Sequence, residues 1–282
     1  MAGTLYLCAT PIGNLEDITY RVVRTLQEVD LIAAEDTRTS QKLLQHYGID
    51  TPMTSYHEFN KIDKANVLVD KLQNGANIAL ITDAGTPGIS DPGEELVRIC
   101  YEQGIEVTSL PGPAACITAV TMSGQACRRF AFEAFLPKDK KERRRVLEEV
   151  AQETRTIIIY EAPHHLKNTL AELQEYLGED RGITLCRELT KKFEEKQKTT
   201  IGEAIAYYGE HDPRGEYVLV LAGKTKEQVQ QEQQAQWDSM TLQEHMNLYE
   251  EQGMDHKAAM KAVAKDRGVG KRDIYRLLLD EE

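Results

Sequence analysis

Three loops rich in glycine and proline are the first places where this sequence could bind a ligand. They span residues 9–15 (ATPIGNL), 83–93 (DAGTPGISDPG) and 110–115 (LPGPAA). Glycine lets a backbone approach a ligand closely, and proline fixes the shape of a loop, so less conformational entropy is lost on binding. Each loop follows an apolar run typical of a strand, and ligands of open α/β sheets bind outside the carboxyl ends of strands. Together the loops predict a ligand site.

Other familiar ligand signatures do not occur in the sequence. There is no GxxxxGK[ST] phosphate loop, and no GxGxxG motif follows the first apolar run. The cysteines are odd in number and widely spaced, with no CxxC pair: Cys8, Cys100, Cys116, Cys127 and Cys186. The adjacent His164 and His165 have no third ligand at suitable spacing. We therefore expect neither a disulfide framework nor a metal site.

Alternating strand and helix patterns would position the three loops. Apolar runs at residues 5–9, 31–34, 78–81 and 107–110 alternate with helical periods at 18–29, 39–47, 92–103 and 114–122. This alternation indicates a parallel sheet covered by helices. A second series has strands at 156–160, 182–186 and 217–222 and helices at 166–177 and 203–210. Its alternation is less strict, which predicts a second α/β domain with a mixed sheet.

Composition divides the chain into four parts. A shift after Gly124 separates an N-terminal α/β domain, residues 1–124, from a C-terminal α/β domain, residues 125–224. Gln, Glu and Lys dominate residues 225–236, a composition typical of a linker. Residues 237–282 predict a helical appendage, spaced like a helix-turn-helix with a basic second helix. This appendage either contacts phosphate or docks as a helical hairpin on the rest of the chain.

Charge and hydropathy restrict the possible partners. The formal net charge is −12, from 34 Lys and Arg against 46 Asp and Glu, which opposes non-specific binding to polyphosphate. A nucleic-acid partner would therefore need a local basic patch, which residues 138–145 or the appendage could offer. In residues 138–145 the interleaved acids favour a solvated helix face. No apolar run approaches the roughly 20 residues of a membrane span. The first seven residues contain no Lys or Arg, so we expect a cytoplasmic protein without a membrane partner.

The loops, in order and position, resemble the tetrapyrrole methylase superfamily of S-adenosylmethionine (SAM) enzymes. Further matching stretches are residues 34–38 (AEDTR), 55–58 (SYHE), 160–165 (YEAPHH) and 187–191 (RELTK). Within the superfamily, the chain is most similar to bacterial 16S ribosomal RNA cytidine 2′-O-methyltransferases, over residues 3–223. The superfamily's Gly-Asp-Pro-x-Ile-Tyr loop corresponds to residues 85–90, where Thr86 replaces the acid and Ser90 the aromatic residue. This departure argues against a tetrapyrrole substrate.

The resemblance implies two α/β domains with a SAM cleft between them, a homodimer, and 16S ribosomal RNA of the small subunit as the partner. It also implies which residues hold SAM: Pro11, Asp83, Ala84, Gly85, Pro87, Ile89, Ser90, Ala114, Ala115, Tyr160, Glu161, Ala162, Thr200 and Ile201. Methyl transfer from a sulfonium needs no metal, because the methyl group is already activated. The main task of such an enzyme is alignment, worth up to roughly 7 to 11 kcal/mol in well-oriented systems.

A ribose 2′-hydroxyl is a poor nucleophile at neutral pH, so a nearby base or cation should accelerate its methylation by about 10² to 10⁴ fold. The candidates at predicted strand ends and in loops are Glu35, Asp36, His57, Glu58, Arg187, Glu188 and Lys191. Glu35, Asp36 and Arg38 are equally typical of a surface ion-pair cluster, and His57 next to Glu58 is more typical of a solvated loop pair. The sequence does not single out one base.

The first functional hypothesis is SAM-dependent 2′-O-methylation of a cytidine ribose in 16S ribosomal RNA, in the assembled small subunit. A first alternative keeps the fold and makes a tetrapyrrole or a protein the methyl acceptor. A second alternative is a nucleic-acid-binding regulator, in which the helix-turn-helix of the appendage binds nucleic acid and the α/β body senses a ligand.

Overall fold

A five-stranded parallel sheet forms the first part of the chain, in the order β3-β2-β4-β1-β5. Its strands are β1 (Thr4–Cys8), β2 (Leu31–Ala34), β3 (Met53–Ser55), β4 (Ile78–Ile81) and β5 (Glu106–Leu110). The helices between them are α1 (Tyr20–Glu28), α2 (Thr37–His46), α3 (Lys61–Gln73) and α4 (Gly93–Glu102), and a 3₁₀ turn, η1 (Leu15–Asp17), precedes α1. The computed structural model describes residues 1–280, so residues 281–282 of the predicted appendage lie outside the description.

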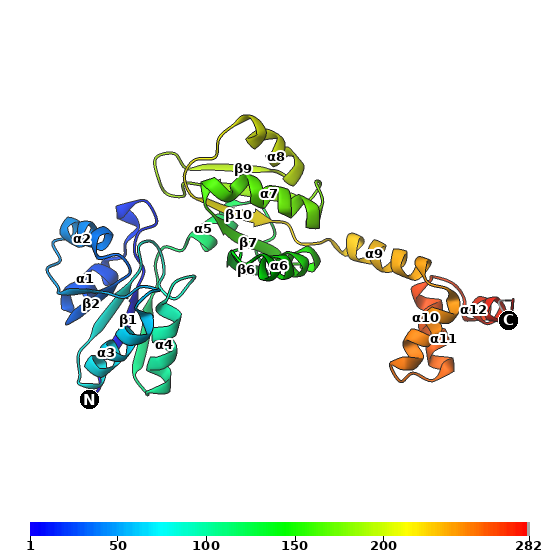
Figure 1. Ribbon diagram of the computed structural model, residues 1–282, viewed down its shortest axis with the longest axis horizontal. Helices are drawn as coiled ribbons and strands as arrows, with labels where there is room; N and C mark the ends of the chain where they lie inside the picture. Colours follow the sequence, from blue (N-terminus) through cyan, green and yellow to red (C-terminus); the bar gives the residue numbers. More distant parts are fainter. Residues whose placement is uncertain (281–282) are drawn as a thin grey trace. The chain divides into compact units, whose positions relative to one another are not determined.

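The two faces of this sheet are covered by different helices (Figure 1). Leu5 and Leu7 of β1 belong to the core under α3 and α4. Cys8 of the same strand faces the core under α1 and α2. Alternate residues of a strand point to opposite faces, so a strand buried on both sides is apolar throughout. The predicted parallel sheet is therefore confirmed, although the sequence patterns missed the short β3 and the amphipathic α3.

A second five-stranded sheet follows, in the order β6-β7-β10-β8-β9. Its strands are β6 (Phe130–Phe135), β7 (Thr156–Glu161), β8 (Gly182–Arg187), β9 (Glu195–Thr200) and β10 (Tyr217–Leu221). β6 and β7 are parallel, whereas β10 and β9 pair antiparallel with their neighbours, so the sheet is mixed as predicted. One face is covered by α6 (Lys140–Gln152), α7 (Pro163–Leu177) and α8 (Ile201–Glu210).

Helix α5 (Ala115–Met122) covers the other face of the second sheet. Cys116, Ala119 and Val120 of this helix pack against Ile158 of β7 and Val218 of β10. The predicted boundary after Gly124 is therefore displaced: packing changes from the first sheet to the second between the end of β5 and α5. Composition marked the later polar stretch instead, because α5 is apolar like the strands before it.

The chain separates into two compact units, Met1–Gly223 with both sheets and Lys224–Glu282. The second unit contains α9 (Lys226–Ser239), α10 (Leu242–Glu251), α11 (His256–Asp266) and α12 (Lys271–Asp280). Its own core joins Leu242, Met246, Val263 and Ile274. Of the linker predicted at residues 225–236, residues 226–236 instead belong to α9 and Thr225 caps it. Gln, Glu and Lys are good helix formers, and Thr225 with Gln228 forms a capping box at its start.

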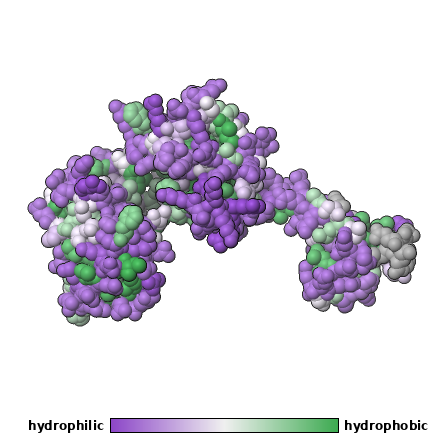
Figure 2. All heavy atoms as spheres, viewed as in Figure 1, coloured by the Kyte–Doolittle hydropathy of each residue, from purple (hydrophilic) through white to green (hydrophobic). Residues whose placement is uncertain are grey.

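The surface carries individual large apolar side chains, of which Tyr20 and Phe59 are among the most exposed. On the face shown in Figure 2, hydrophilic residues predominate and hydrophobic ones are scattered between them. Among the described residues, no helix is both long enough and apolar enough to cross a bilayer. Four of the five cysteines are buried and reduced, while Cys127 is exposed.

Candidate active site

A cavity of about 430 Å³ lies where the loops of the two sheets meet within the first unit. Its volume falls in the range of small-molecule sites, roughly 300 to 1,000 Å³. The first sheet and its loops contribute Ile12, Glu35, Thr82, Ala84, Gly85, Thr86, Ile89, Ser90, Asp91, Ala114 and Ala115. The second sheet contributes Phe135, Tyr160, Glu161, Ala162, Pro163, Leu189, Glu216, Tyr217 and Val218.

The three glycine- and proline-rich loops are fastened to one another at this cavity. Thr10 and Gly85 exchange two backbone hydrogen bonds, of 2.9 and 3.0 Å, which join the first loop to the second. The hydroxyl of Thr86 donates to the carbonyl oxygen of Pro113 at 2.9 Å, which joins the second loop to the third. Gly85 has φ +90°, a backbone conformation that strongly favours glycine. The loops thus form one wall, as their spacing predicts.

Asp91 holds the end of the second loop in place. Its carboxylate accepts backbone hydrogen bonds from Gly88, Ile89 and Gly93, at distances between 2.8 and 3.1 Å. A carboxylate anchored by several amides fixes the loop conformation and keeps the negative charge at the cavity. Gly93 begins α4, so Asp91 also supplies acceptors at the start of that helix.

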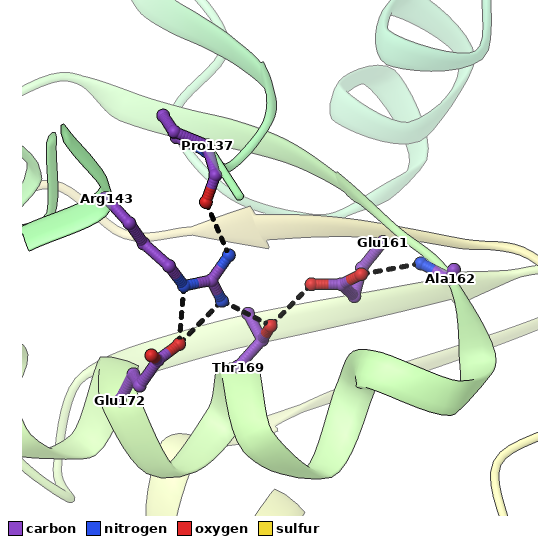
Figure 3. A network of polar contacts seen from close by, with 6 residues as sticks. All are labelled: Pro137, Arg143, Glu161, Ala162, Thr169 and Glu172. Atoms are coloured by element: carbon purple, nitrogen blue, oxygen red, sulfur yellow. Dashed lines mark hydrogen bonds and ion pairs between the residues drawn. The ribbon is translucent and has the colours of Figure 1, made fainter. Parts of the chain in front are cut away.

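A polar network fixes Glu161 on the opposite wall (Figure 3). Glu161 is the last residue of β7 and only 6% exposed, and its Oε1 accepts the backbone N–H of Ala162 at 2.7 Å. Its Oε2 accepts the hydroxyl hydrogen of Thr169 on α7. Thr169 in turn accepts a hydrogen bond from Arg143 at 2.9 Å, and Arg143 pairs with Glu172. The Glu161 carboxylate is therefore held in one orientation.

Backbone strain is concentrated at the cavity. Among the described residues, the non-glycine residues with positive φ are Ser90, Ala134, Glu188 and Thr190. Ser90 lines the cavity, Ala134 precedes the lining residue Phe135, and Glu188 and Thr190 flank the lining residue Leu189. Such conformations cost about 1 to 3 kcal/mol each and cluster at functional sites. The strain marks this cavity as the candidate active site.

The titratable groups that line the cavity are mainly carboxylates: Glu35, Asp91, Glu161 and Glu216. Glu216 is exposed at the rim and pairs with Lys191 at 2.8 Å. Among the described residues that form the lining there is no lysine or arginine. Burial raises the pKa of Glu35, and the nearby Asp83 and Asp91 charges raise it further, against a hydrogen bond from the Asp83 amide. A cleft lined by one sign of charge favours a ligand of the opposite sign, here a cation.

Most of the residues predicted to hold the cofactor meet at this cavity. The lining includes Ala84, Gly85, Ile89, Ser90, Ala114, Ala115, Tyr160, Glu161 and Ala162. Pro11, Asp83 and Pro87 belong to the same loops but adjoin lining residues instead of lining the cavity. The prediction that these residues bind a cofactor stays a prediction.

Thr200 and Ile201 were predicted at the cleft but lie elsewhere. Thr200 caps α8 with its side chain, and Ile201 is fully buried in the core of the second sheet. Thr200 pairs with Gly182 at the start of β8, whereas the cavity adjoins the other end of that strand. A residue at the far end of a six-residue strand cannot reach the site.

Of the predicted catalytic candidates, only Glu35 lines the cavity. Asp36 caps α2 and pairs with Arg38 at 2.9 Å, and hydrogen bonds from Arg38 lower the pKa of Asp36 to about 2. Glu58 pairs with Lys61 at 2.6 Å. The Asp36–Arg38 contact matches the surface ion-pair interpretation, whereas Glu58 pairs with Lys61 instead of His57.

The other candidates do not line the cavity, although Glu188 adjoins the lining residue Leu189. His57 lies beside Asn60, with 3.3 Å between His57 Nε2 and Asn60 Nδ2. Arg187 pairs with Glu195 at 2.7 Å, and Lys191 bridges Glu188 and Glu216 at 2.9 and 2.8 Å. The Lys191 bridge holds the loop that carries Leu189, so it shapes the rim.

The sequence patterns missed lining residues on the second sheet. Phe135 follows a β-bulge in β6, a strand that the patterns did not assign. Glu216 directly precedes β10 and Tyr217 begins it, and Tyr217 pairs with Glu161 at the end of β7. Because β10 is antiparallel to β7, its beginning reaches the edge where β7 ends. Recognising that strand direction would have found them.

Comparison with known proteins settles the family. Residues 4–205 match the family described as Tetrapyrrole (Corrin/Porphyrin) Methylases. The chain belongs to the tetrapyrrole methylase family. This methyltransferase is 48% identical to a protein of Synechocystis sp. over 99% of both chains, and 48% identical to one of Halalkalibacterium halodurans over 99% of this chain and 96% of the relative. Both relatives are named "Ribosomal RNA small subunit methyltransferase I".

The fold of the methyltransferase also matches solved structures. A crystal structure of diphthine synthase superposes with a TM-score of 0.62 at 10% sequence identity, covering 79% of this chain and 91% of that chain. At this identity the likeness concerns the fold alone. The predicted architecture of two α/β domains with a C-terminal helical part is confirmed.

Proposed function

We propose that this methyltransferase transfers the methyl group of SAM to the 2′-hydroxyl of a cytidine ribose in 16S ribosomal RNA. The observation that carries the proposal is the 48% identity, over nearly the whole chain, to proteins named as ribosomal RNA small subunit methyltransferases. Thr86 and Ser90, where tetrapyrrole enzymes of the family have an acid and an aromatic residue, support an acceptor other than a tetrapyrrole.

The chemistry of the cavity fits SAM. A sulfonium is positively charged, and the cavity lining carries the carboxylates of Glu35, Asp91, Glu161 and Glu216. Apolar side chains at Ile89 and Ala115 can flank the uncharged parts of the cofactor. When bound, SAM supplies a methyl group activated by the sulfonium, and the acceptor hydroxyl gives up its proton.

Three features of the chain would serve this reaction. Asp91 fixes the loop of residues 85–91, and Glu161, held by Thr169 and the Ala162 amide, presents a carboxylate of fixed orientation. Glu35 is our proposed proton acceptor, since it is the catalytic candidate that lines the cavity and burial raises its pKa. The two walls would align the hydroxyl with the methyl donor and exclude water.

The proposal includes the setting of the reaction. A net charge of −12 suits an enzyme that recognises an assembled small subunit locally better than one that coats naked RNA. We therefore propose that it acts in the cytoplasm on the assembled subunit, as a homodimer.

The test is transfer of a labelled methyl group from SAM to purified small ribosomal subunits, with naked 16S RNA in parallel. Nuclease digestion and mass spectrometry then identify the methylated nucleoside. A ribose-methylated cytidine from subunits supports the proposal. Label on a protein or on a nucleobase would refute the proposed acceptor, and absence of SAM binding would refute the cofactor and favour a ligand sensor. An E35Q variant that keeps the wild-type rate would refute the role of Glu35.

A further inference from the structure

Positive charge is concentrated on two helices of an otherwise acidic protein. Residues 257–276, which form most of α11 and α12, contain seven Lys or Arg and two Asp, while the whole chain carries a net charge of −12. The remainder of the chain is correspondingly more acidic. Such a segregation gives a local field that the net charge does not reveal.

The cations of α11 lie on its solvent face. Lys257, Lys261 and Lys265 follow one another at intervals of four residues and are all exposed. Ala259 and Val263, on the opposite face, are fully buried in the core of the second unit. Residues four apart lie one above the other on a helix, so the three lysines form a stripe along α11.

Helix α12 presents a second basic face after a short turn. Lys271, Arg272, Tyr275 and Arg276 are exposed, and Tyr275 is 58% exposed, whereas Ile274 is fully buried. The turn is tight because Gly268 adopts φ +64°. The buried Ile274 anchors α12 to the core and leaves its basic face free to contact a partner.

Most of these cations have no acidic partner. Among the described residues, Lys257, Lys261, Lys265, Lys271 and Arg272 form no ion pair, while Arg276 lies 3.5 Å from Asp273. The basic stretch on α6 differs, since Arg144 pairs with Glu148 at 2.9 Å and Arg145 lies 3.9 Å from Glu149. The arginines of the α6 stretch are thus compensated, although its three lysines form no ion pair among the described residues; on the α11–α12 face, of the described residues, only Arg276 lies beside an acid.

The placement of two of these cations works against the helix that carries them. Lys271 and Arg272 are the first two residues of α12. The N-terminal turn of a helix carries partial positive charge, which favours acids there and disfavours Lys and Arg. Asp273 in the same turn accepts a hydrogen bond from the Gly270 amide at 3.1 Å and offsets part of this charge, and a bound anion would offset the rest by contacting the two cationic side chains.

We propose that the exposed faces of α11 and α12 bind the phosphate backbone of ribosomal RNA, with Lys261, Lys271 and Arg272 contacting phosphates and Tyr275 stacking on a base or a ribose. The identity of this partner rests on the proposed function. The geometry favours a polyanion, since the unpaired cations extend along two helices, and an exposed aromatic side chain among cations is typical of surfaces that bind single-stranded RNA.

The test compares two triple variants of the full-length protein. K261E/K271E/R272E reverses three unpaired cations of the proposed surface. The matched control, K42E/K71E/K226E, reverses three exposed lysines on α2, α3 and α9, so both variants change the net charge equally. In the first variant, glutamate at positions 271 and 272 is favourable because the start of α12 carries partial positive charge. Glutamate at position 261 has a lysine four residues away on either side, which is also favourable. The first variant is therefore expected to fold. Thermal unfolding checks this.

The readout is binding of each variant to purified small ribosomal subunits as a function of salt concentration, beside SAM affinity. We expect the surface variant to bind at least about tenfold more weakly at low salt, and the slope of log K against log salt to fall by about 2 to 3, since each phosphate contact contributes roughly 0.7 to 0.9. The control keeps the wild-type slope, and SAM affinity is unchanged in both. Y275A is expected to weaken binding about 5- to 150-fold without changing the slope.

If the surface variant and the control both keep the wild-type affinity and salt slope, the proposal is overturned, and an acidic protein is left as the candidate partner. Equal losses in both would also overturn it, because net charge alone would then explain binding. Methyl transfer separates this outcome from failure of the proposed function. A wild-type protein that binds subunits through this surface but methylates no cytidine refutes the proposed function and keeps the inference, and the converse result refutes the inference alone.

Discussion

Replacing Thr169 by valine tests whether the network around Glu161 fixes the site. Thr169 is fully buried; its hydroxyl donates to Glu161 and accepts from Arg143 at 2.9 Å. Valine has nearly the same shape but no hydroxyl, so T169V removes both hydrogen bonds without opening a large cavity. Oε2 of Glu161 then has no hydrogen-bond donor from the described residues.

The expected loss of stability in T169V depends on which hydrogen-bond partners Glu161 and Arg143 keep. A hydrogen bond to a charged group contributes about 1.5 to 3 kcal/mol. Arg143 keeps Glu172, which lies 2.6 and 2.8 Å from its nitrogens, so the cost falls mainly on Glu161. We expect the free energy of unfolding of the first unit to fall by about 2 to 3 kcal/mol, which corresponds to a Tm lower by about 4 to 12 °C for a unit of this size. The freed carboxylate should also weaken SAM binding by about tenfold.

Thermal unfolding and titration calorimetry with SAM measure the two effects. T169S keeps the hydroxyl and should therefore restore most of the stability and most of the SAM affinity. Its remaining loss of stability is the cost of one lost methyl group, about 1 kcal/mol. T121V is the matched control, because Thr121 is an exposed threonine whose hydroxyl bonds only within α5. A T169V protein with the stability and SAM affinity of the wild type would show that the network does not position Glu161.

Three further predictions follow from particular contacts. In G13A, the added Cβ would lie 2.4 Å from Lys191 Cγ and 2.9 Å from the Leu189 carbonyl oxygen, so we expect the two loops to separate and SAM affinity, measured by calorimetry, to fall about tenfold or more; unchanged affinity would contradict this. If Glu35 is the base, kcat/KM rises with pH through a pKa above that of an ordinary glutamate, and an E35Q variant with the same pH profile would exclude it. Burial lowers the pKa of His245, so the folded second unit binds fewer protons than the unfolded chain, whose histidine titrates near 6.5. Urea unfolding followed by the fluorescence of Trp237, which stacks on His245, should show stability that is constant above about pH 6.5 and falls below it; an H245F variant with the same loss would refute this cause.

Much of the fold could be predicted from local patterns. Strands buried on both faces are continuous apolar runs, and Leu5 to Cys8 illustrate this in β1. Helix α9 was missed because its exposed polar residues show no apolar period, so its composition was typical of a linker. Its capping box, Thr225 with Gln228, was the available signal.

By itself the sequence determined the kind of site: glycines and prolines at strand ends, and the motifs of a methylase family. Only the tertiary structure decided which side chains face the cavity. Glu35 lines it and the adjacent Asp36 does not, because successive residues at a strand end point in different directions. The antiparallel direction of β10 brings Tyr217 beside Glu161, and the opposite end of β8 holds Thr200 away. Strand direction and side-chain orientation depend on contacts between segments distant in sequence, which no local pattern encodes.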